Sequence, residues 1–141
     1  MAVLRELALE SQVSVRGEPQ PGFPVEPNTT AGDVLWLGPD EWLAVGRRES
    51  DYPDAAAVVD VSANRVCFEL TGDGVEDVLA QGCSLDLHPA VFGPGRCAQT
   101  LLAKAEVILH RTELETFRIF VRPSFVPYLR AWLEDAITGA R

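Results

Sequence analysis

RVCFELTGDGVEDVLAQGC, residues 65–83, contains two hydrophobic periods in succession. In its first half, Val66, Phe68 and Leu70 alternate with less apolar residues, which is the pattern of a strand with one buried face. In its second half, the apolar residues at positions 75, 78 and 79 recur three and four places apart, which predicts a short helix. A strand that runs directly into a helix favours a fold that combines a sheet with helices.

The two ends of this predicted helix carry their own signals. Asp73 and Glu76 have the spacing of a capping box, so we expect them to satisfy the first turn. Gly82 suits the C-terminal end, because many helices stop at a glycine in the left-handed conformation. The helix therefore leads into the loop GCSLDLHPAVFGPGRC, Gly82–Cys97.

Upstream, the sequence predicts a β-hairpin. Two runs with strand propensity, Val34–Leu37 and Glu41–Val45, flank the turn signal GPD. Trp36 and Trp42 lie close to this turn. Tryptophans at such spacing are usually core residues, and beside a turn they also suit a contact with a partner protein.

Further strands are predicted over Val58–Val61, over AQTLLAKAEVILHR (residues 98–111) and over TFRIFV (residues 116–121). The chain then ends in a helix over PSFVPYLRAWLEDAITG, residues 123–139. We expect Ser124 as its N-cap and Pro127 in its first turn. Its predicted core stripe consists of Phe125, Tyr128, Leu129, Trp132, Leu133 and Ala136. Two β-rich units that each end in a helix predict an α+β domain with a pseudo-repeat.

The segment RGEPQPGFPVEPNTTAG, residues 16–32, has four prolines, three glycines and no hydrophobic period. Such a composition is typical of an irregular connection. We therefore expect residues 1–32 to be an N-terminal segment with a Pro/Gly-rich connection. Residues 33–141 then form one α+β domain, which is a size that a single hydrophobic core can support.

The net charge of −9 is concentrated in the first half, where residues 1–70 carry 12 acidic and 5 basic residues. A surface of this sign repels phosphate backbones, so a nucleic-acid partner is disfavoured. No apolar run approaches the ~20 residues of a membrane span, and the first residues do not resemble a signal peptide. We expect a cytoplasmic protein with no membrane partner and with three reduced cysteines.

The loop Gly82–Cys97 carries residue types that are common in active sites. Cys83, His88 and Cys97 could ligate zinc, but the spacing C-x4-H-x8-C lacks a C-x2-C pair and a nearby fourth ligand. A Cys83–His88 nucleophile oriented by Asp86 would need three loop residues to hold a working geometry by themselves. GPGR and TGDG match no phosphate-binding motif. We therefore expect no catalytic, cofactor-binding or metal-binding residue in this chain.

Several motifs in order resemble one family. LWLGPDEWL, GCSLDLHP, FGPGRCAQT and TFRIFVRPSFVPYLRAWLEDA, which lie between Leu35 and Ala136, resemble the γ subunit of heterotetrameric sarcosine oxidase. That subunit is in turn similar to the folate-binding domain of the glycine-cleavage aminomethyltransferases. The second likeness implies an α+β domain made of two swapped β-α-β halves. Glu106 is the nearest match to the acidic residue that meets the folate in aminomethyltransferases.

The resemblance implies an accessory role rather than a catalytic one. The complex of that family oxidatively demethylates sarcosine to glycine, and its FAD, FMN, NAD, tetrahydrofolate and zinc are held by other subunits. The partners implied are the alpha and beta subunits. Six residues are predicted to contact them, namely Trp36, Trp42, Asp86, His88, Phe92 and Arg96. Two alternatives are a stand-alone folate-binding or one-carbon-transfer domain and a homo-oligomer of the same fold.

Overall fold

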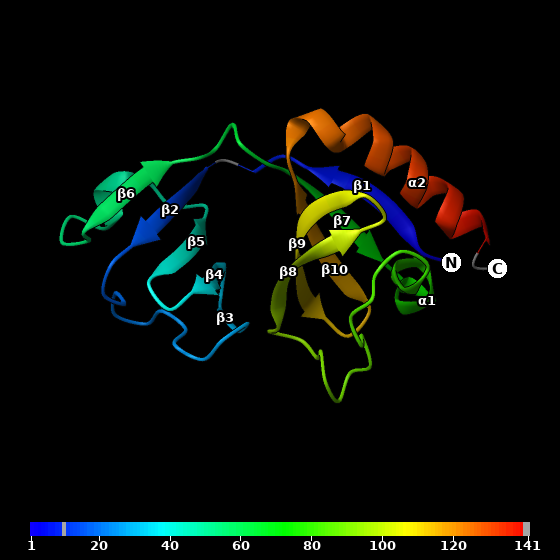
Figure 1. Cartoon of the computed structure of the whole chain (residues 1–141), viewed down its shortest axis with the longest axis horizontal. Coiled ribbons are helices and arrows are strands. Elements are labelled where there is room, and N and C mark those ends of the chain that lie inside the picture. Colours follow the sequence, from blue (N-terminus) through cyan, green and yellow to red (C-terminus); the bar gives the residue numbers. More distant parts are fainter. Residues whose placement is uncertain (10, 140–141) are drawn as a thin grey trace. The chain divides into compact units, whose positions relative to one another are not determined.

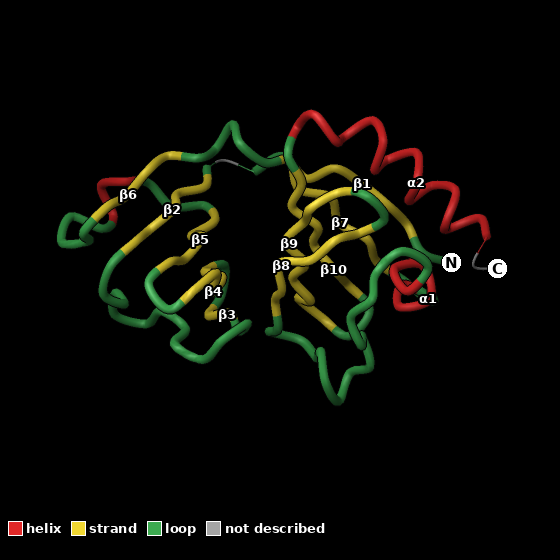
Figure 2. The backbone as a smooth tube through the Cα atoms, viewed as in Figure 1, coloured by secondary structure: helices red, strands yellow, loops and turns green. Residues whose placement is uncertain are grey.

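The computed structural model describes residues 1–9 and 11–139, so Glu10, Ala140 and Arg141 of the predicted segments lie outside the described residues. The chain divides into two compact units. Unit 1 comprises Met1–Leu7 and the chain from Arg65 onward, and unit 2 is Ala8–Asn64. Each unit contains one five-stranded antiparallel sheet, so the fold is mixed and rich in sheet (Figures 1 and 2).

The sheet of unit 1 joins strands from both ends of the chain. Its order is β1 (Val3–Leu7), β7 (Val66–Thr71), β10 (Thr116–Val121), β9 (Ala105–Glu113) and β8 (Cys97–Leu102). The predicted strand at residues 65–70 is confirmed as β7, one residue further along. Phe68 of β7 lies opposite Ile119 of β10, so the apolar alternation of the two strands faces the same side.

Two α-helices among the described residues cover that side of the sheet, α1 (Val75–Ala80) and α2 (Val126–Gly139). Both helices contribute to one core with the sheet. Its fully buried members include Leu70, Leu79, Leu109, Phe117, Ile119, Leu129 and Leu133. Trp132 packs against this core, as predicted.

Because unit 2 is inserted in the sequence between β1 and β7, α1 follows a strand of unit 1. The described part of unit 2 therefore does not end in an α-helix, unlike the arrangement that the sequence suggested.

The predicted N-terminal caps of the two helices were wrong, whereas Gly82 follows the end of α1 and Pro127 lies in the first turn of α2 as predicted. Helix α1 begins after Gly74, which has a φ of 83° and provides no side-chain cap. The Glu76 carboxylate binds the Arg111 guanidinium instead of closing a capping box with Asp73. At α2, a short 3-10 helix, η2 (Pro123–Phe125), precedes the α-helix, so Ser124 lies inside a helical turn and not at its cap.

The predicted stripe of α2 is only partly buried. Leu129, Leu133 and Ala136 are buried, but Phe125 and Tyr128 are 37% and 39% exposed. The cause is positional, because the two exposed residues lie at or before the first turn of α2, beside the 3-10 turn. The Tyr128 hydroxyl accepts a hydrogen bond from the Lys104 backbone N–H at 3.3 Å, which places its ring at the β8–β9 turn.

The sheet of unit 2 has the order β3 (Thr30–Ala31), β4 (Val34–Gly38), β5 (Glu41–Val45), β2 (Gln12–Arg16) and β6 (Ala57–Asp60). Strands β4 and β5 confirm the predicted hairpin, and a 3-10 helix, η1 (Glu49–Asp51), follows them. Strands β2 and β4 lie on opposite sides of residue 32 and belong to one sheet, so the predicted domain boundary does not coincide with the division of the structure.

Candidate functional site

Arg111 of β9 connects the α1–β8 loop (residues 81–96) to the rest of unit 1. Its side chain is fully buried. One guanidinium nitrogen, Nη1, donates hydrogen bonds to the carbonyl oxygens of Leu87 and Phe92, both at 2.8 Å. Nε donates to the carbonyl of Leu114 at 3.0 Å, and Nη2 donates to the Glu76 carboxylate at 3.1 Å. We call Arg111 and these four partners the Arg111 site.

A buried guanidinium is stable only when its donors are satisfied, because moving an unpaired charge out of water is costly. Three backbone carbonyls and one carboxylate provide that satisfaction here. The guanidinium also lies 4.8 Å from the centroid of the Phe117 ring, which adds a cation–π contact. The donors of this arginine are therefore used to hold the backbone and not to bind a substrate.

Two apolar side chains of the α1–β8 loop, Leu87 and Phe92, also anchor it to unit 1. Leu87 and Phe92 are 5% and 6% exposed, and the rings of Phe92 and Phe117 are stacked with centroids 6.3 Å apart. At the end of the loop, the Gly95 N–H donates to the Arg111 carbonyl and the Arg111 N–H donates to the Arg96 carbonyl. These bonds continue the β8–β9 pairing into the loop.

Gly82 stands where the loop leaves α1 and where a side chain would not fit. A Cβ atom at this position would lie 2.5 Å from Cζ2 of Trp132 and 2.9 Å from the Ala103 backbone nitrogen. The Ala103 N–H donates to the Gly82 carbonyl at 2.9 Å. Glycine is therefore required by this close approach of the loop to α2 and the β8–β9 turn.

The exposed tip of the loop does not form a catalytic arrangement. The Asp86 carboxylate accepts a hydrogen bond from the His88 backbone N–H at 3.0 Å. The His88 ring accepts one from the Ala90 N–H through Nδ1, also at 3.0 Å. Cys83 is a buried free thiol. These hydrogen bonds close local turns, which is the usual use of such side chains in loops.

The residues Cys83, His88 and Cys97, whose spacing already disfavoured zinc, do not form a cluster in the structure. Over residues 1–9 and 11–139, no group of three or more His, Cys, Asp or Glu side chains could hold a metal ion. The donor set does not fit zinc, which takes four close ligands in structural sites.

Trp42 and Phe92 were predicted to contact a partner, and in the structure both side chains are buried within their own units. Trp42 is 0% exposed and its indole Nε1 donates to the Pro24 carbonyl at 2.8 Å. Phe92 lies in the core of unit 1. Each side chain is covered by its own unit because each one anchors a loop.

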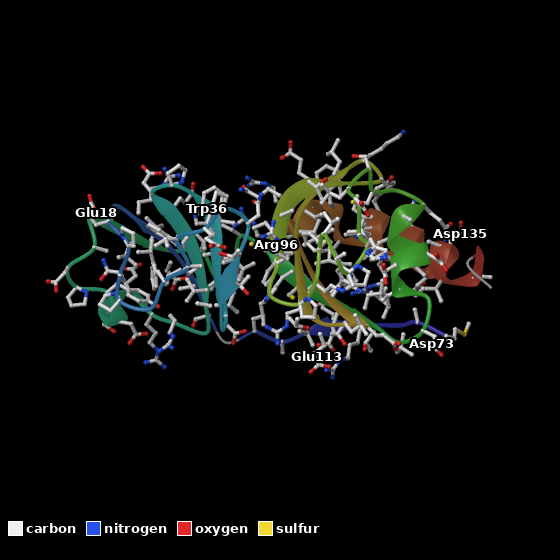
Figure 3. The ribbon with its side chains drawn as sticks, turned by 90° about the horizontal axis from the view of Figure 1, so that it is seen from below. Glu18, Trp36, Asp73, Arg96, Glu113 and Asp135 are labelled. Atoms are coloured by element: carbon white, nitrogen blue, oxygen red, sulfur yellow. The ribbon has the colours of Figure 1, made fainter. Side chains whose placement is uncertain are left out.

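The other four predicted contact residues are accessible to different degrees. Asp86 and His88 are exposed, whereas Trp36 and Arg96 are half-buried. Trp36 pairs directly with Trp42 across the β4–β5 hairpin, and it is only partly covered by the core beneath it. Figure 3 labels Trp36 in unit 2 and Arg96 at the end of the α1–β8 loop.

In unit 2, the β2–β3 loop (residues 17–29) closes over a small core. The ring of Phe23 lies 5.4 Å from that of Trp42 and 5.2 Å, edge-on, from that of Tyr52. Burial raises the pKa of the Tyr52 phenol above 10.0, an effect that Arg47 opposes and Asp51 supports. Residues 17–29 of the predicted irregular connection thus form a loop without regular secondary structure, and Phe23 of this loop packs in the core of unit 2.

Arg111 was not identified as a functional residue from the sequence. Val107 and Leu109 of β9 are both buried, and Arg111 continues their alternation. The pattern therefore indicates that the Arg111 side chain lies on the same face of the strand. Its partners at Leu87, Phe92 and Glu76 are 19 to 35 positions away. No local pattern links residues at such separations.

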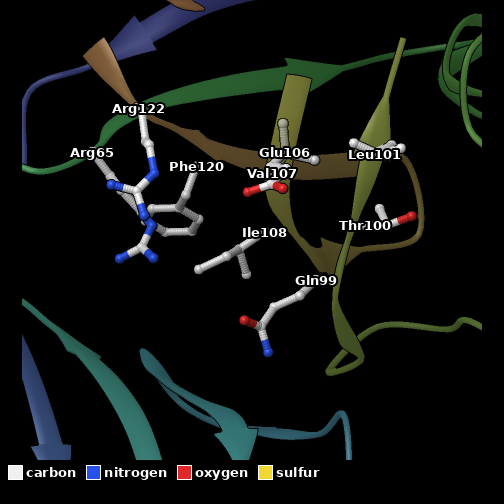
Figure 4. Close-up of a pocket in the computed structure, with 9 residues that line it drawn as sticks. All are labelled: Arg65, Gln99, Thr100, Leu101, Glu106, Val107, Ile108, Phe120 and Arg122. Carbon is white, nitrogen blue, oxygen red and sulfur yellow. The ribbon is translucent and has the colours of Figure 1, made fainter. Parts of the chain in front are cut away.

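A depression of about 410 Å³ lies on the sheet of unit 1. Figure 4 shows the guanidinium groups of Arg65 and Arg122 at one end, Phe120 beside them, and the Glu106 carboxylate away from them. Its volume is within the range of small-molecule sites. Glu106, which the resemblance to aminomethyltransferases singled out in the sequence, is one of the residues that line it. Of the described helices, none is long and apolar enough to cross a membrane.

Comparisons with known proteins agree on one family. The model of the sarcosine oxidase, gamma subunit family matches residues 25–139. Sarcosine oxidase subunit gamma from Arthrobacter sp. is 36% identical over 96% of this chain and 80% of its own length. The subunit from Corynebacterium sp. strain P-1 is 35% identical over 96% and 79%. A chain in the structure of heterotetrameric sarcosine oxidase from Corynebacterium sp. U-96 in complex with pyrrole 2-carboxylate aligns with a TM-score of 0.87 and 34% identity, covering 98% of this chain and 84% of that one.

Proposed function

The chain belongs to the sarcosine oxidase gamma subunit family, and we propose on this basis that it is the gamma subunit of a heterotetrameric sarcosine oxidase. The observation that carries the proposal is the match to one chain of such an assembly at 34% identity over 98% of this chain. Identity at this level over nearly the full length includes both units. The partners of this chain would then be the alpha and beta subunits.

The role is accessory in an enzyme that oxidatively demethylates sarcosine to glycine. Two features support a structural rather than a catalytic role for this chain. The Arg111 guanidinium donates to three carbonyls and one carboxylate of its own unit. Asp86 and His88 accept hydrogen bonds from the backbone of their own loop.

The cofactors FAD, FMN, NAD, tetrahydrofolate and zinc belong in this proposal to the other subunits. The likeness to the family supports this assignment, and the donor set of this chain does not suit zinc. A cytoplasmic location is part of the same proposal. It is supported by the three buried cysteines, none of which is in a disulfide, as is common for cytoplasmic proteins.

Four residues remain in the proposed contact with the large subunits, namely Trp36, Asp86, His88 and Arg96. Asp86 and His88 are exposed on a loop that the Arg111 site holds in one conformation. A loop that is ordered before association loses little conformational entropy on binding.

The decisive experiment is co-expression of this chain with the alpha and beta subunits from the same organism. We expect a stable complex that contains this chain, and a complex of lower stability when this chain is omitted. An active assembly of unchanged rate and thermal stability without this chain would contradict the proposal.

We also propose that the fold resembles the two swapped β-α-β halves of an aminomethyltransferase folate-binding domain. The exchange of the N-terminal strand supports this idea, because β1 pairs in unit 1 while β2, only a few residues later, pairs in unit 2. The check is a superposition of experimental coordinates of the two units on each other and on such a domain.

A stand-alone folate-binding or one-carbon-transfer domain is the second candidate function. The 410 Å³ depression with Glu106 in its lining favours it. Titration of tetrahydrofolate into the isolated chain, followed by tryptophan fluorescence, separates the two functions. Saturable binding that the Glu106→Gln variant loses would support this second candidate, and the absence of any saturable change would exclude it.

A further inference from the structure

The Arg111 site brings together two surface segments of unit 1. The Phe92 carbonyl belongs to the α1–β8 loop, and the Leu114 carbonyl belongs to the β9–β10 turn. Because both carbonyls accept hydrogen bonds from one guanidinium, the two segments lie next to each other. Val91, which precedes Phe92, and Leu114 are each 55% exposed. Two branched apolar side chains therefore project from neighbouring, fixed backbones.

A depression of about 270 Å³ lies beside Leu114 in the chain, because the next residue, Glu115, lines it. Its lining comes from the β7–α1 turn, the first turn of α1 and the residue that follows Leu114, and it comprises Gly72, Gly74, Val75, Glu76, Asp77 and Glu115. The Gly72 N–H donates to the Glu115 carbonyl at 2.9 Å, which joins the two walls. Three of these residues carry carboxylates; that of Glu76 is already paired with the Arg111 guanidinium, so Asp77 and Glu115 supply the negative charge that a partner would meet.

We propose that Val91, Leu114 and the adjoining depression form a docking surface for a segment of a large subunit with an apolar side chain beside a lysine or arginine. This inference rests on the proposed function as gamma subunit. The apolar pair supplies the area that is removed from water. The carboxylates select the charge of the partner, because like charges across an interface repel and opposite charges speed association.

Buried contacts within unit 1 fix the conformation of this surface before any partner binds. The Arg111 guanidinium fixes both segments from below, and Phe92 stacks on Phe117 beneath Val91. Binding therefore does not require either segment to become ordered, which favours affinity. Arg111 acts here as a positioning residue through the backbone of the two segments.

The test measures association of full-length gamma variants with tagged alpha and beta subunits. The apolar variants are Leu114→Ser and Val91→Ser, and the charge variants are Asp77→Lys and Glu115→Lys. Leu101→Ser is the matched apolar control, because Leu101 is 54% exposed on β8, and Glu134→Lys is the charge control on the exposed face of α2. We expect each test variant to weaken association about 10-fold and each control to leave it unchanged.

The charge variants should in addition reduce the sensitivity of association to salt, which a purely structural defect would not do. Equal association of wild type, Leu114→Ser and Glu115→Lys would overturn the docking surface while leaving the gamma-subunit assignment intact. Failure of the wild-type chain to join the large subunits would instead contradict the proposed function. Self-association of the wild type that Leu114→Ser abolishes would overturn the choice of a large subunit as the occupant.

Discussion

The α1–β8 loop of unit 1 and the β2–β3 loop of unit 2 are both irregular, and each is anchored by one buried side chain. In unit 1, Arg111 donates to two loop carbonyls and to one carbonyl outside the loop. In unit 2, Trp42 donates to the single carbonyl of Pro24 and packs against Phe23.

The comparison indicates that the loss of an aromatic anchor and the loss of a buried arginine reduce stability for different reasons and by different amounts. An aromatic anchor acts mainly through buried area, and truncating it leaves a cavity. A buried arginine acts through directed hydrogen bonds, and its loss leaves acceptors without donors in a dry environment. The α1–β8 loop should therefore depend more strongly on its anchor than the β2–β3 loop does.

The largest expected effect comes from Arg111→Met. This change keeps much of the side-chain volume but removes the donors to Leu87, Phe92 and Leu114, so we expect a loss of about 3–5 kcal/mol in the free energy of unfolding. Urea denaturation of the isolated chain measures it. Arg5→Met is the control, because Arg5 is 65% exposed and pairs with Glu69 at the surface, where about 1 kcal/mol or less is expected. Equal losses in the two variants would contradict the assigned role.

Gly82→Ala tests how closely the α1–β8 loop is packed. The added methyl group would meet Trp132 and the backbone of Ala103, so we expect a loss of about 3 kcal/mol. Gly22→Ala is the matching change in the β2–β3 loop, where no atom lies within 4 Å and only the φ of 82° opposes a side chain. We expect about 1 kcal/mol there. A larger loss for Gly22→Ala would reverse the comparison.

Trp42→Phe probes the aromatic anchor. The variant keeps an aromatic ring but leaves the Pro24 carbonyl without its donor and a small void in the core, so we expect a loss on the order of 2 kcal/mol. Trp36→Phe in the same hairpin should cost less, because Trp36 is only half-buried. Thermal unfolding of the two variants measures the difference, and a greater effect at Trp36 would show that the wrong tryptophan has been named as the anchor.

Glu76→Gln separates the ion pair from the carbonyl contacts of Arg111. The side chain of Glu76 is 40% exposed, so solvent screens the pair and we expect a loss below about 1 kcal/mol. A loss close to that of Arg111→Met would mean that the ion pair, and not the three carbonyls, holds the guanidinium in place.

The smallest expected effect is a pH dependence at Tyr52. Burial raises the pKa of this phenol, so the folded state favours its neutral form. The stabilisation is fully present below pH 10 and is lost as the pH rises through the folded-state pKa. Stability of the wild type should therefore fall more steeply than that of Tyr52→Phe at alkaline pH. Identical alkaline slopes in denaturation experiments would contradict this assignment.

The local sequence pattern was sufficient to predict several secondary-structure elements. The alternation of residues 66–70, the helical spacing of residues 75–79 and the turn signal between β4 and β5 each predicted the element found there. These patterns work because strand and helix periods follow from backbone geometry within a few residues. The ordered motifs also led to the family that the comparisons support.

Other features depended on distant pairing. Strands β1 and β2 were missed, because each is five residues long and gains its hydrogen bonds from β7 or from β5 and β6 far along the chain. The interior position of Trp42 and the partial exposure of Trp36 could not be separated, since both tryptophans flank the same turn. The capping role expected of Glu76 failed because a buried arginine 35 positions away binds its carboxylate.

By itself, the sequence determined the periods of the main strands and helices, the acidic charge and the family of this protein. The tertiary structure alone decided that the α1–β8 loop is held by Arg111, and which of its side chains remain at the surface. The physical reason is the range of the forces involved. Backbone sterics act between neighbouring residues, whereas a buried donor is satisfied by whichever acceptor the folded chain brings within hydrogen-bonding distance.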